Sequence, residues 1–158
     1  MAKRRRRWGA PKHPNLTPVE HKRVTGGQDP NDPSGEPVTV YELVGGMEYF
    51  IALVDRFYDA VQSDAILRPL YPEDLADARR HTALFLAQYW GGPPIYNNER
   101  GHPRLRMRHA PFVIAEAERD RWLGHMLDSV AATELHPEVE KLFVNYFEHA
   151  STAMINSE

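Results

Sequence analysis

The sequence predicts an all-α domain that follows a disordered N-terminal arm. Apolar residues recur at three- and four-residue spacing in several segments after Tyr41, which is the pattern of helices with one buried face. Clusters of glycine and proline separate these segments. No stretch of comparable length shows the two-residue alternation of a strand. Because the chain has 158 residues, we expect one compact domain with a sizeable core.

The arm covers residues 1–37 and differs in composition from the domain predicted over 38–158. It contains 8 Lys/Arg against 4 Asp/Glu, whereas the remainder contains 11 against 18, so a basic arm precedes an acidic body. Six of the 13 prolines lie in the arm, which predicts disorder. The Arg4–Arg7 run is typical of a solvated tail; a weak contact with nucleic acid or another polyanion is the functional alternative.

Composition excludes several classes of site. The chain has no cysteine, so disulfides, thiolate nucleophiles and iron–sulfur clusters are ruled out, and any metal must be bound by His, carboxylate, Tyr or Met. No apolar run reaches the roughly 18 residues of a membrane-spanning helix. A twin-arginine export signal is rejected because no apolar segment follows Trp8. These features predict a soluble, cytoplasmic protein.

The first long helix follows Gly45-Gly46 and directs Tyr58 inward. A corner at 67–72 comes next, since Pro69 and Pro72 preclude a continuous helix. Asp74 is the expected N-cap of the second long helix, which ends at the glycines and prolines of 91–94.

The second half of the chain is also predicted to consist of helices separated by irregular segments. Residues 95–103 are predicted to form an irregular loop, and a short helical segment is expected around 105–109. A long helix is predicted near 115–133, with acidic residues in its first turns that suit the positive end of a helix. Pro137 is well placed as the first residue of a final helix.

Three inward residues carry polar groups that need partners if buried: Tyr58, Tyr71 and Trp122. Each hydroxyl or indole could be satisfied by a backbone carbonyl, as in an ordinary core. His109, taken alone, is better explained as an ordinary surface or capping histidine. Spacing by itself does not assemble these residues into a site.

Five ordered sequence blocks resemble the group II truncated haemoglobins over nearly all of residues 38–157. They are RFY at 56–58, LYPED at 70–74, FLAQYWGGP at 85–93, GHPRLRMRHAPF at 101–112 and ERDRWL at 118–123. The Gly-Gly pairs at 45–46 and 91–92 also match the glycine motifs of this family. The resemblance implies a two-over-two helical sandwich that holds haem b.

The resemblance implies a role for each of the four polar residues. His109 would be the proximal iron ligand, its second ring nitrogen donating to a backbone carbonyl. Tyr58, Tyr71 and Trp122 would lie on the distal side, where their donors would stabilise bound O2 and slow its release. Which tyrosine makes the main bond is left open.

Other positions are expected to complete the haem site. Ala78 cannot donate a hydrogen bond, and the Thr82 hydroxyl either joins the distal network or bonds its own helix backbone. Arg104 and Arg106 are expected on the solvated face or against a partner. The expected apolar walls are Phe85, Leu86, Leu105, Phe112 and Met126. The residues expected near the haem propionates are Arg108, His81 and Tyr96.

The sequence leaves three functions in competition. The first is a haem protein that binds O2, CO and NO without dedicated turnover. The second is a redox enzyme of the NO dioxygenase or peroxidase type, which would need an external reductase. The third is a haem-free module that binds nucleic acid through the arm, against which the acidic body argues. A homo-oligomer is also left open.

Overall fold

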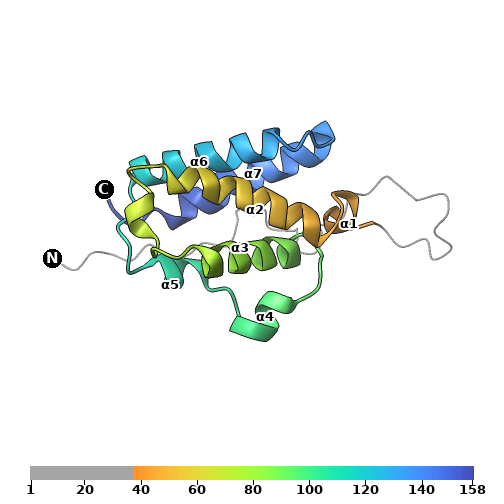
Figure 1. The fold of residues 1–158 in the computed structure, drawn as a ribbon, viewed down its shortest axis with the longest axis horizontal. Coiled ribbons are helices and arrows are strands. Elements are labelled where there is room, and N and C mark those ends of the chain that lie inside the picture. Colours follow the sequence, from red (N-terminus) through yellow and green to blue (C-terminus); the bar gives the residue numbers. More distant parts are fainter. Residues whose placement is uncertain (1–37) are drawn as a thin grey trace.

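The structure, a computed structural model, describes residues 38–158, so the predictions for the arm lie outside the described residues. Within that part of the chain every regular element is helical, as predicted, and no helix is long and apolar enough to span a membrane. The elements are α1 Val40–Leu43, α2 Met47–Gln62, the 3₁₀ turn η1 Arg68–Leu70, α3 Ala76–Tyr89, α4 Ile95–Arg100, α5 Leu105–His109, α6 Glu116–Ala131 and α7 Pro137–Met154 (Figure 1).

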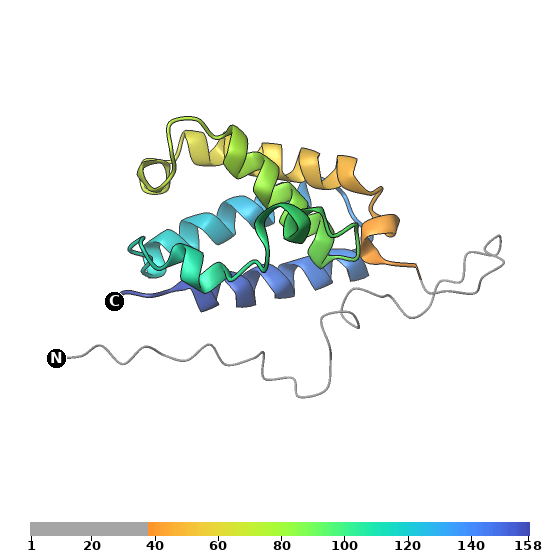
Figure 2. The ribbon, with the colours of Figure 1, turned by 90° about the horizontal axis from the view of Figure 1, so that it is seen from below.

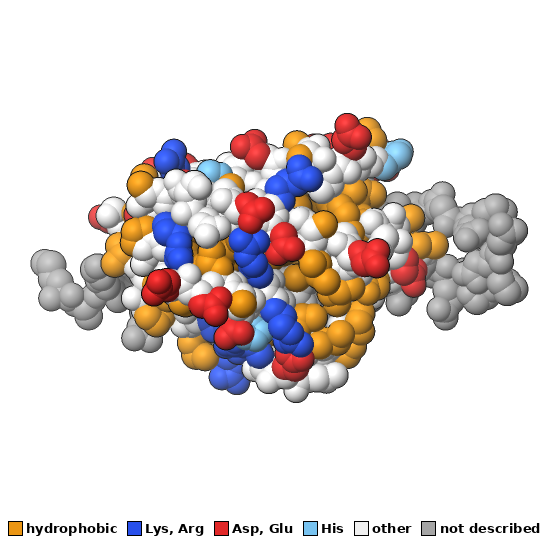
Figure 3. Space-filling model, in the orientation of Figure 1, with side chains coloured by type: hydrophobic (Ala, Val, Ile, Leu, Met, Phe, Trp, Pro, Cys, Tyr) orange, Lys and Arg blue, Asp and Glu red, His pale blue; other side chains and the backbone are white. Residues whose placement is uncertain are grey.

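The four long helices form two pairs, which confirms the predicted two-over-two arrangement. Helix α2 packs on α3, and α6 packs on α7 (Figure 2). Aromatic side chains fill the space where the pairs meet: Trp90 lies 4.7 Å from Phe143 between ring centroids, and Phe57 lies 5.2 Å from Trp122. The face of the molecule seen in Figure 3 carries interspersed charges of both signs with hydrophobic atoms between them.

The two glycine pairs lie at helix ends, where the sequence predicted breaks. Gly91 has φ +103°, and a Cβ built on it would lie 2.8 Å from the Thr39 side chain. A Cβ on Gly92 would lie 2.7 Å from the Ala87 carbonyl oxygen. The Tyr41 backbone N–H donates to the carbonyl oxygen of Trp90 at 2.9 Å. Because Gly91 and Gly92 have no side chains, α1 can pack closely against the end of α3.

Asp64 joins the corner after α2 to helix α6. Its Oδ1 accepts the backbone N–H groups of Ile66 and Leu67 at 2.8 and 3.0 Å. Its Oδ2 lies 2.7 Å from His125 Nε2 and 3.1 Å from Arg121 Nε. These bonds hold the pKa of this buried carboxyl at about 2: burial opposes ionisation, but the donors outweigh it.

Two predictions about the elements were wrong in part. Residues 95–100 form α4 instead of a loop, because Tyr96 is buried against Phe85 and Asn97 N–H donates to the Gln88 side chain at 3.0 Å. The N-cap of α3 is Leu75, one residue later than expected. Asp74 still contributes, since its carboxylate accepts the Ala76 N–H at 2.9 Å.

Candidate functional site

A cavity of about 410 Å³ opens between the corner and helices α3, α5, α6 and α7. This volume is within the range of small-molecule sites, and most of the lining is apolar. Every residue expected in a haem site lines this one cavity. They are Tyr58, Tyr71, His81, Thr82, Phe85, Leu86, Tyr96, Leu105, Arg108, His109, Phe112, Trp122 and Met126.

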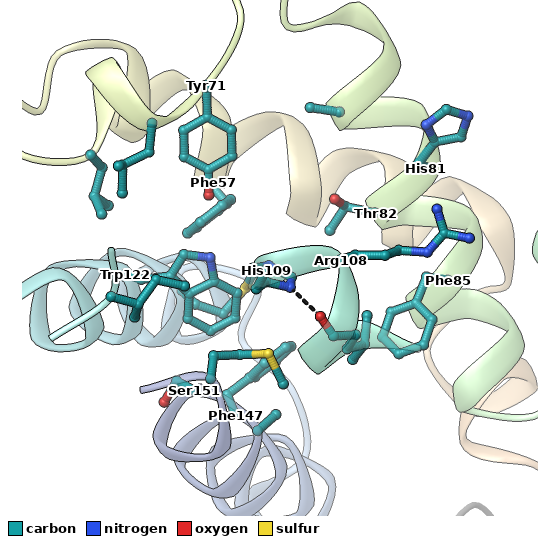
Figure 4. Close-up of a pocket in the computed structure, with 18 of the residues that line it drawn as sticks. Phe57, Tyr71, His81, Thr82, Phe85, Arg108, His109, Trp122, Phe147 and Ser151 are labelled. Atoms are coloured by element: carbon teal, nitrogen blue, oxygen red, sulfur yellow. Dashed lines mark hydrogen bonds between the residues drawn. The ribbon is translucent and has the colours of Figure 1, made fainter. Parts of the chain in front are cut away.

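His109 is the last residue of α5, and its ring is oriented by its own helix. Nδ1 lies 2.6 Å from the carbonyl oxygen of Leu105, drawn as the dashed line in Figure 4. A carbonyl can only accept, so Nδ1 is the donor and the tautomer that this bond favours has its lone pair on Nε2. The sequence at 105–109 thus prepares an imidazole for binding a metal through Nε2.

Tyr58 and Thr82 form one part of the polar lining. Their hydroxyls lie 3.0 Å apart, so Thr82 joins the side-chain network, one of the two alternatives left open by the sequence. Burial raises the pKa of the Tyr58 hydroxyl, while Thr82 and the nearby Arg79 lower it in part. Tyr58 therefore stays protonated and able to donate or accept.

Tyr71 and Trp122 form the second part. The Tyr71 hydroxyl and the Trp122 indole face one another in Figure 4, and hydrogen bonding from Trp122 is one of the influences on the Tyr71 pKa. Burial and the neighbouring Tyr58 raise the Tyr71 pKa above its ordinary value, and the bond to Trp122 offsets only part of this. An indole N–H can only donate, so the Tyr71 oxygen accepts it. The Tyr71 proton remains available for a bond of its own.

Basic residues lie at one edge of the cavity. Arg100 Nη1 lies 2.7 Å from His81 Nδ1, so this ring nitrogen accepts from the guanidinium. Burial, and then the charge of Arg100, lower the His81 pKa. Arg108 donates through Nε to the Pro103 carbonyl at 2.7 Å and through Nη2 to the Arg100 carbonyl at 3.1 Å. Arg108 thus anchors the 100–103 segment as well as lining the cavity.

Arg106 was expected on the solvated face or against a partner, and the structure gives it a contact within the chain. It is partly buried, and its Nη1 donates to the Ala153 carbonyl at 2.9 Å, which ties α5 to α7. Phe112 was expected in an apolar wall of the site. It lines the cavity but keeps 42% of its surface exposed. It forms an edge of the cavity, whereas Met126 is fully buried in its wall.

The sequence analysis missed several cavity residues. They include Phe57, Arg100, Arg119, Tyr146, Phe147 and Ser151. Tyr146 and Phe147 lie on the inner face of α7, where they pack with the core. Helical periodicity separates inside from outside, and it cannot separate a core contact from a cavity wall on the same face.

The side chains that line the cavity suit a metal ion whose other ligands belong to a bound cofactor. Within residues 38–158, no group of three or more His, Asp or Glu side chains could hold a metal ion. A single prepared imidazole in an apolar cavity, with cationic side chains at the edge, fits an iron porphyrin that carries carboxylates.

Comparisons with known proteins agree with this geometry. The chain matches the bacterial-like globin family over residues 39–156. It is 40% identical over 116 residues to the group 2 truncated haemoglobin YjbI of Bacillus subtilis, which covers 73% of this chain and 87% of the relative.

Two solved structures are similar to the whole described domain. A thermostable haemoglobin of the actinobacterium Thermobifida fusca has 50% sequence identity and a TM-score of 0.74, covering 75% of this chain and 98% of that one. A truncated oxygen-avid haemoglobin of Bacillus subtilis has 40% identity and a TM-score of 0.70, covering 74% and 98%.

Proposed function

The chain belongs to the bacterial-like globin family and is a group II truncated haemoglobin, and on this premise we propose that it holds haem b through His109 and binds diatomic gases. Membership of the family implies haem-based ligand binding. The observation that supports His109 as the ligand is its 2.6 Å bond from Nδ1 to the Leu105 carbonyl, which leaves Nε2 to donate its lone pair. Arg100 and Arg108 would hold the carboxylates of the porphyrin at the cavity edge.

Bound haem would supply an iron with a coordination site for O2, CO or NO. The chain would supply polarity beside that position. The Tyr71 hydroxyl, already accepting from Trp122, would direct its own proton to a bound ligand, and Tyr58 with Thr82 would form a second donor pair. A donor to a partly charged acceptor contributes about 1.5–3 kcal/mol, which favours slow release of O2. The oxygen-avid relative fits this proposal.

Redox turnover is a second candidate function that the Tyr71–Trp122 pair would support. The same donors could assist oxidation of NO to nitrate by O2, or of other substrates by peroxide. The reaction of NO with O2 would need one electron per turnover from a separate reductase, whereas the peroxide reaction would take its electrons from the substrate that it oxidises. Rapid re-reduction of the oxidised protein by a purified reductase would favour an enzyme over a simple gas binder.

The first test is an optical titration with hemin, recorded in the ferric state, after dithionite reduction and under CO. We expect a one-to-one complex with a sharp Soret band and a CO adduct. The matched pair of variants is His109→Ala and His149→Ala. His149 makes the same ring-to-carbonyl bond, 2.6 Å to Asn145, but is exposed and lies outside the cavity lining.

The two histidine variants should differ sharply. His149→Ala should keep the Soret band of the wild type, and His109→Ala should lose it. Equal spectra in both variants would contradict the role given to His109. A wild-type protein that does not bind hemin would contradict the function itself.

A further inference from the structure

The segment that carries His109 has little stability of its own. Helix α5 has 5 residues, none of them buried, and it begins after Arg104, which has φ +43° and no side-chain capping bond. Helices shorter than about 12–15 residues are marginal in water. Contacts from elsewhere in the chain must therefore hold α5 against the cavity.

Asn156, just beyond the end of α7, supplies such contacts. Its Nδ2 donates to the carbonyl oxygens of Phe112 at 2.8 Å and of His109 at 3.3 Å. Its Oδ1 accepts the backbone N–H of Ile114 at 2.9 Å. The Asn156 backbone N–H in turn donates to the Ile114 carbonyl at 2.9 Å. One residue thus bonds to three positions in the segment that leaves α5.

The orientation of this amide is determined by its surroundings. Both N–H groups meet carbonyl oxygens, and Oδ1 also lies 3.1 Å from the Ser157 hydroxyl, which donates to it. An amide turned by 180° would set oxygen against two carbonyls and nitrogen against an N–H donor. The network therefore needs an amide at position 156, with its donors toward His109 and Phe112.

From this network we infer that Asn156 is a positioning residue for His109, an inference that rests on the proposed function. The His109 carbonyl accepts from Asn156 and also from the Phe112 backbone N–H at 3.0 Å. The His109 ring is bonded within α5 to Leu105, so a shift of α5 shifts Nε2 as well. Asn156 thereby sets the place at which Nε2 meets the cavity.

The test compares three variants of the full chain after loading with hemin: Asn156→Ala, Asn156→Asp and, as control, Asn145→Ala. Asn145 is an exposed residue of α7 outside the cavity lining. The two readouts are the rate at which haem passes to an excess of apomyoglobin and the iron–histidine stretching band in the resonance Raman spectrum of the ferrous protein. Thermal unfolding of each variant checks that it is folded.

We expect Asn156→Ala to lose haem about 10- to 100-fold faster than wild type, as is usual when a partner that orients a metal ligand is removed. Its Raman band should shift or broaden. Asn156→Asp has nearly the same shape but sets an oxygen against the His109 and Phe112 carbonyls, so it should be no better than alanine. Asn145→Ala should match wild type.

The outcomes separate this inference from the function beneath it. If wild type binds haem and both Asn156 variants keep its haem-loss rate and Raman band, Asn156 does not position His109. If Asn156→Asp alone behaves like wild type, shape rather than donation matters, and the inference fails. If wild type forms no haem complex, both the proposed function and this inference are contradicted.

Discussion

At the scale of single residues, the hydroxyl of Tyr71 combines two roles. In the proposed site it would accept from the Trp122 indole and leave its own proton for a ligand. A hydroxyl that accepts one hydrogen bond becomes a better donor in the next, so Trp122 would strengthen the bond from Tyr71 to the ligand. This differs from an arrangement in which both side chains donate separately.

Replacing Tyr71 by Phe should therefore speed O2 release roughly 10- to 150-fold, which corresponds to a loss of about 1.5–3 kcal/mol. Trp122→Phe should have a smaller effect in the same direction. The double variant should release O2 about as fast as Tyr71→Phe alone, because the indole then has nothing to strengthen. Stopped-flow dissociation kinetics measure all three rates.

Tyr49→Phe is the control for this series. Tyr49 is a tyrosine whose hydroxyl lies 3.0 Å from Thr133 Oγ1, as that of Tyr58 does from Thr82, but it is outside the cavity lining. Its O2 release should be that of wild type. Additive effects of the Tyr71 and Trp122 substitutions would instead show two independent donors.

At the scale of elements, long helices were predictable and short ones less so. Helices α2, α6 and α7 have enough turns for apolar spacing to reveal a buried face. Helix α4 has only 6 residues and contains Asn97 and Asn98, which are weak helix formers, so local sequence gives it no signal. It forms because Tyr96 is buried against α3, a contact that only the folded chain provides.

In the candidate site, too, some features were predictable from the sequence and others were not. The sequence resemblance named Tyr58, Tyr71, His109 and Trp122, and all four line the cavity. It could not decide the partner of Thr82 or the task of Arg106. Both depend on residues distant in sequence, Tyr58 and Ala153, whose proximity is a result of folding.

The close contact of α1 with α3 gives an element-scale prediction. Gly92→Ala should destabilise the protein by about 1–3 kcal/mol, because the added Cβ would lie 2.6 Å from the Tyr41 ring of α1 and 2.7 Å from the Ala87 carbonyl oxygen of α3, which cannot easily move. Gly124→Ala makes the same chemical change in α6, where nothing lies within 4 Å, and should stabilise by about 0.4–1 kcal/mol. Urea unfolding measures both. Equal effects of the two would show that the contact is unimportant.

The bonds that Asp64 makes between the corner and α6 predict that the stability of the protein depends on pH. The folded pKa of Asp64, about 2, is below its ordinary value of 3.8. Its ionised form therefore contributes stability that is fully present above pH 4 and is lost as the pH falls toward 2. This contribution to the free energy of unfolding is about 2 kcal/mol. Asp64→Asn should lose roughly this much at pH 7.

Urea unfolding of wild type and Asp64→Asn between pH 7 and pH 2 measures this contribution. The difference in the free energy of unfolding should shrink as the pH falls below 4. Asp120→Asn is the control, because Asp120 is exposed and its pair with Arg119 is worth little. A difference between wild type and Asp64→Asn that stays constant with pH would contradict the assigned pKa.

At the scale of the whole molecule, the predicted boundary at residue 37 can be tested by deletion. A chain of residues 38–158 should bind hemin with the stoichiometry and Soret band of the full chain, since every cavity residue lies within it. Any salt-sensitive binding to DNA or heparin should disappear with the arm, which holds Arg4–Arg7. Weaker haem binding after deletion would show that the arm belongs to the globin domain.

The placement of Trp90 and Trp122, two of the three tryptophans, gives the protein an internal optical reporter. Trp122 lines the cavity, and Trp90 packs against Tyr146, which also lines it. A haem in that space would lie close enough to both indoles to take up their excitation energy, so their fluorescence would fade as the cavity fills. Apoprotein emission could therefore follow haem entry and departure in real time, with no added label.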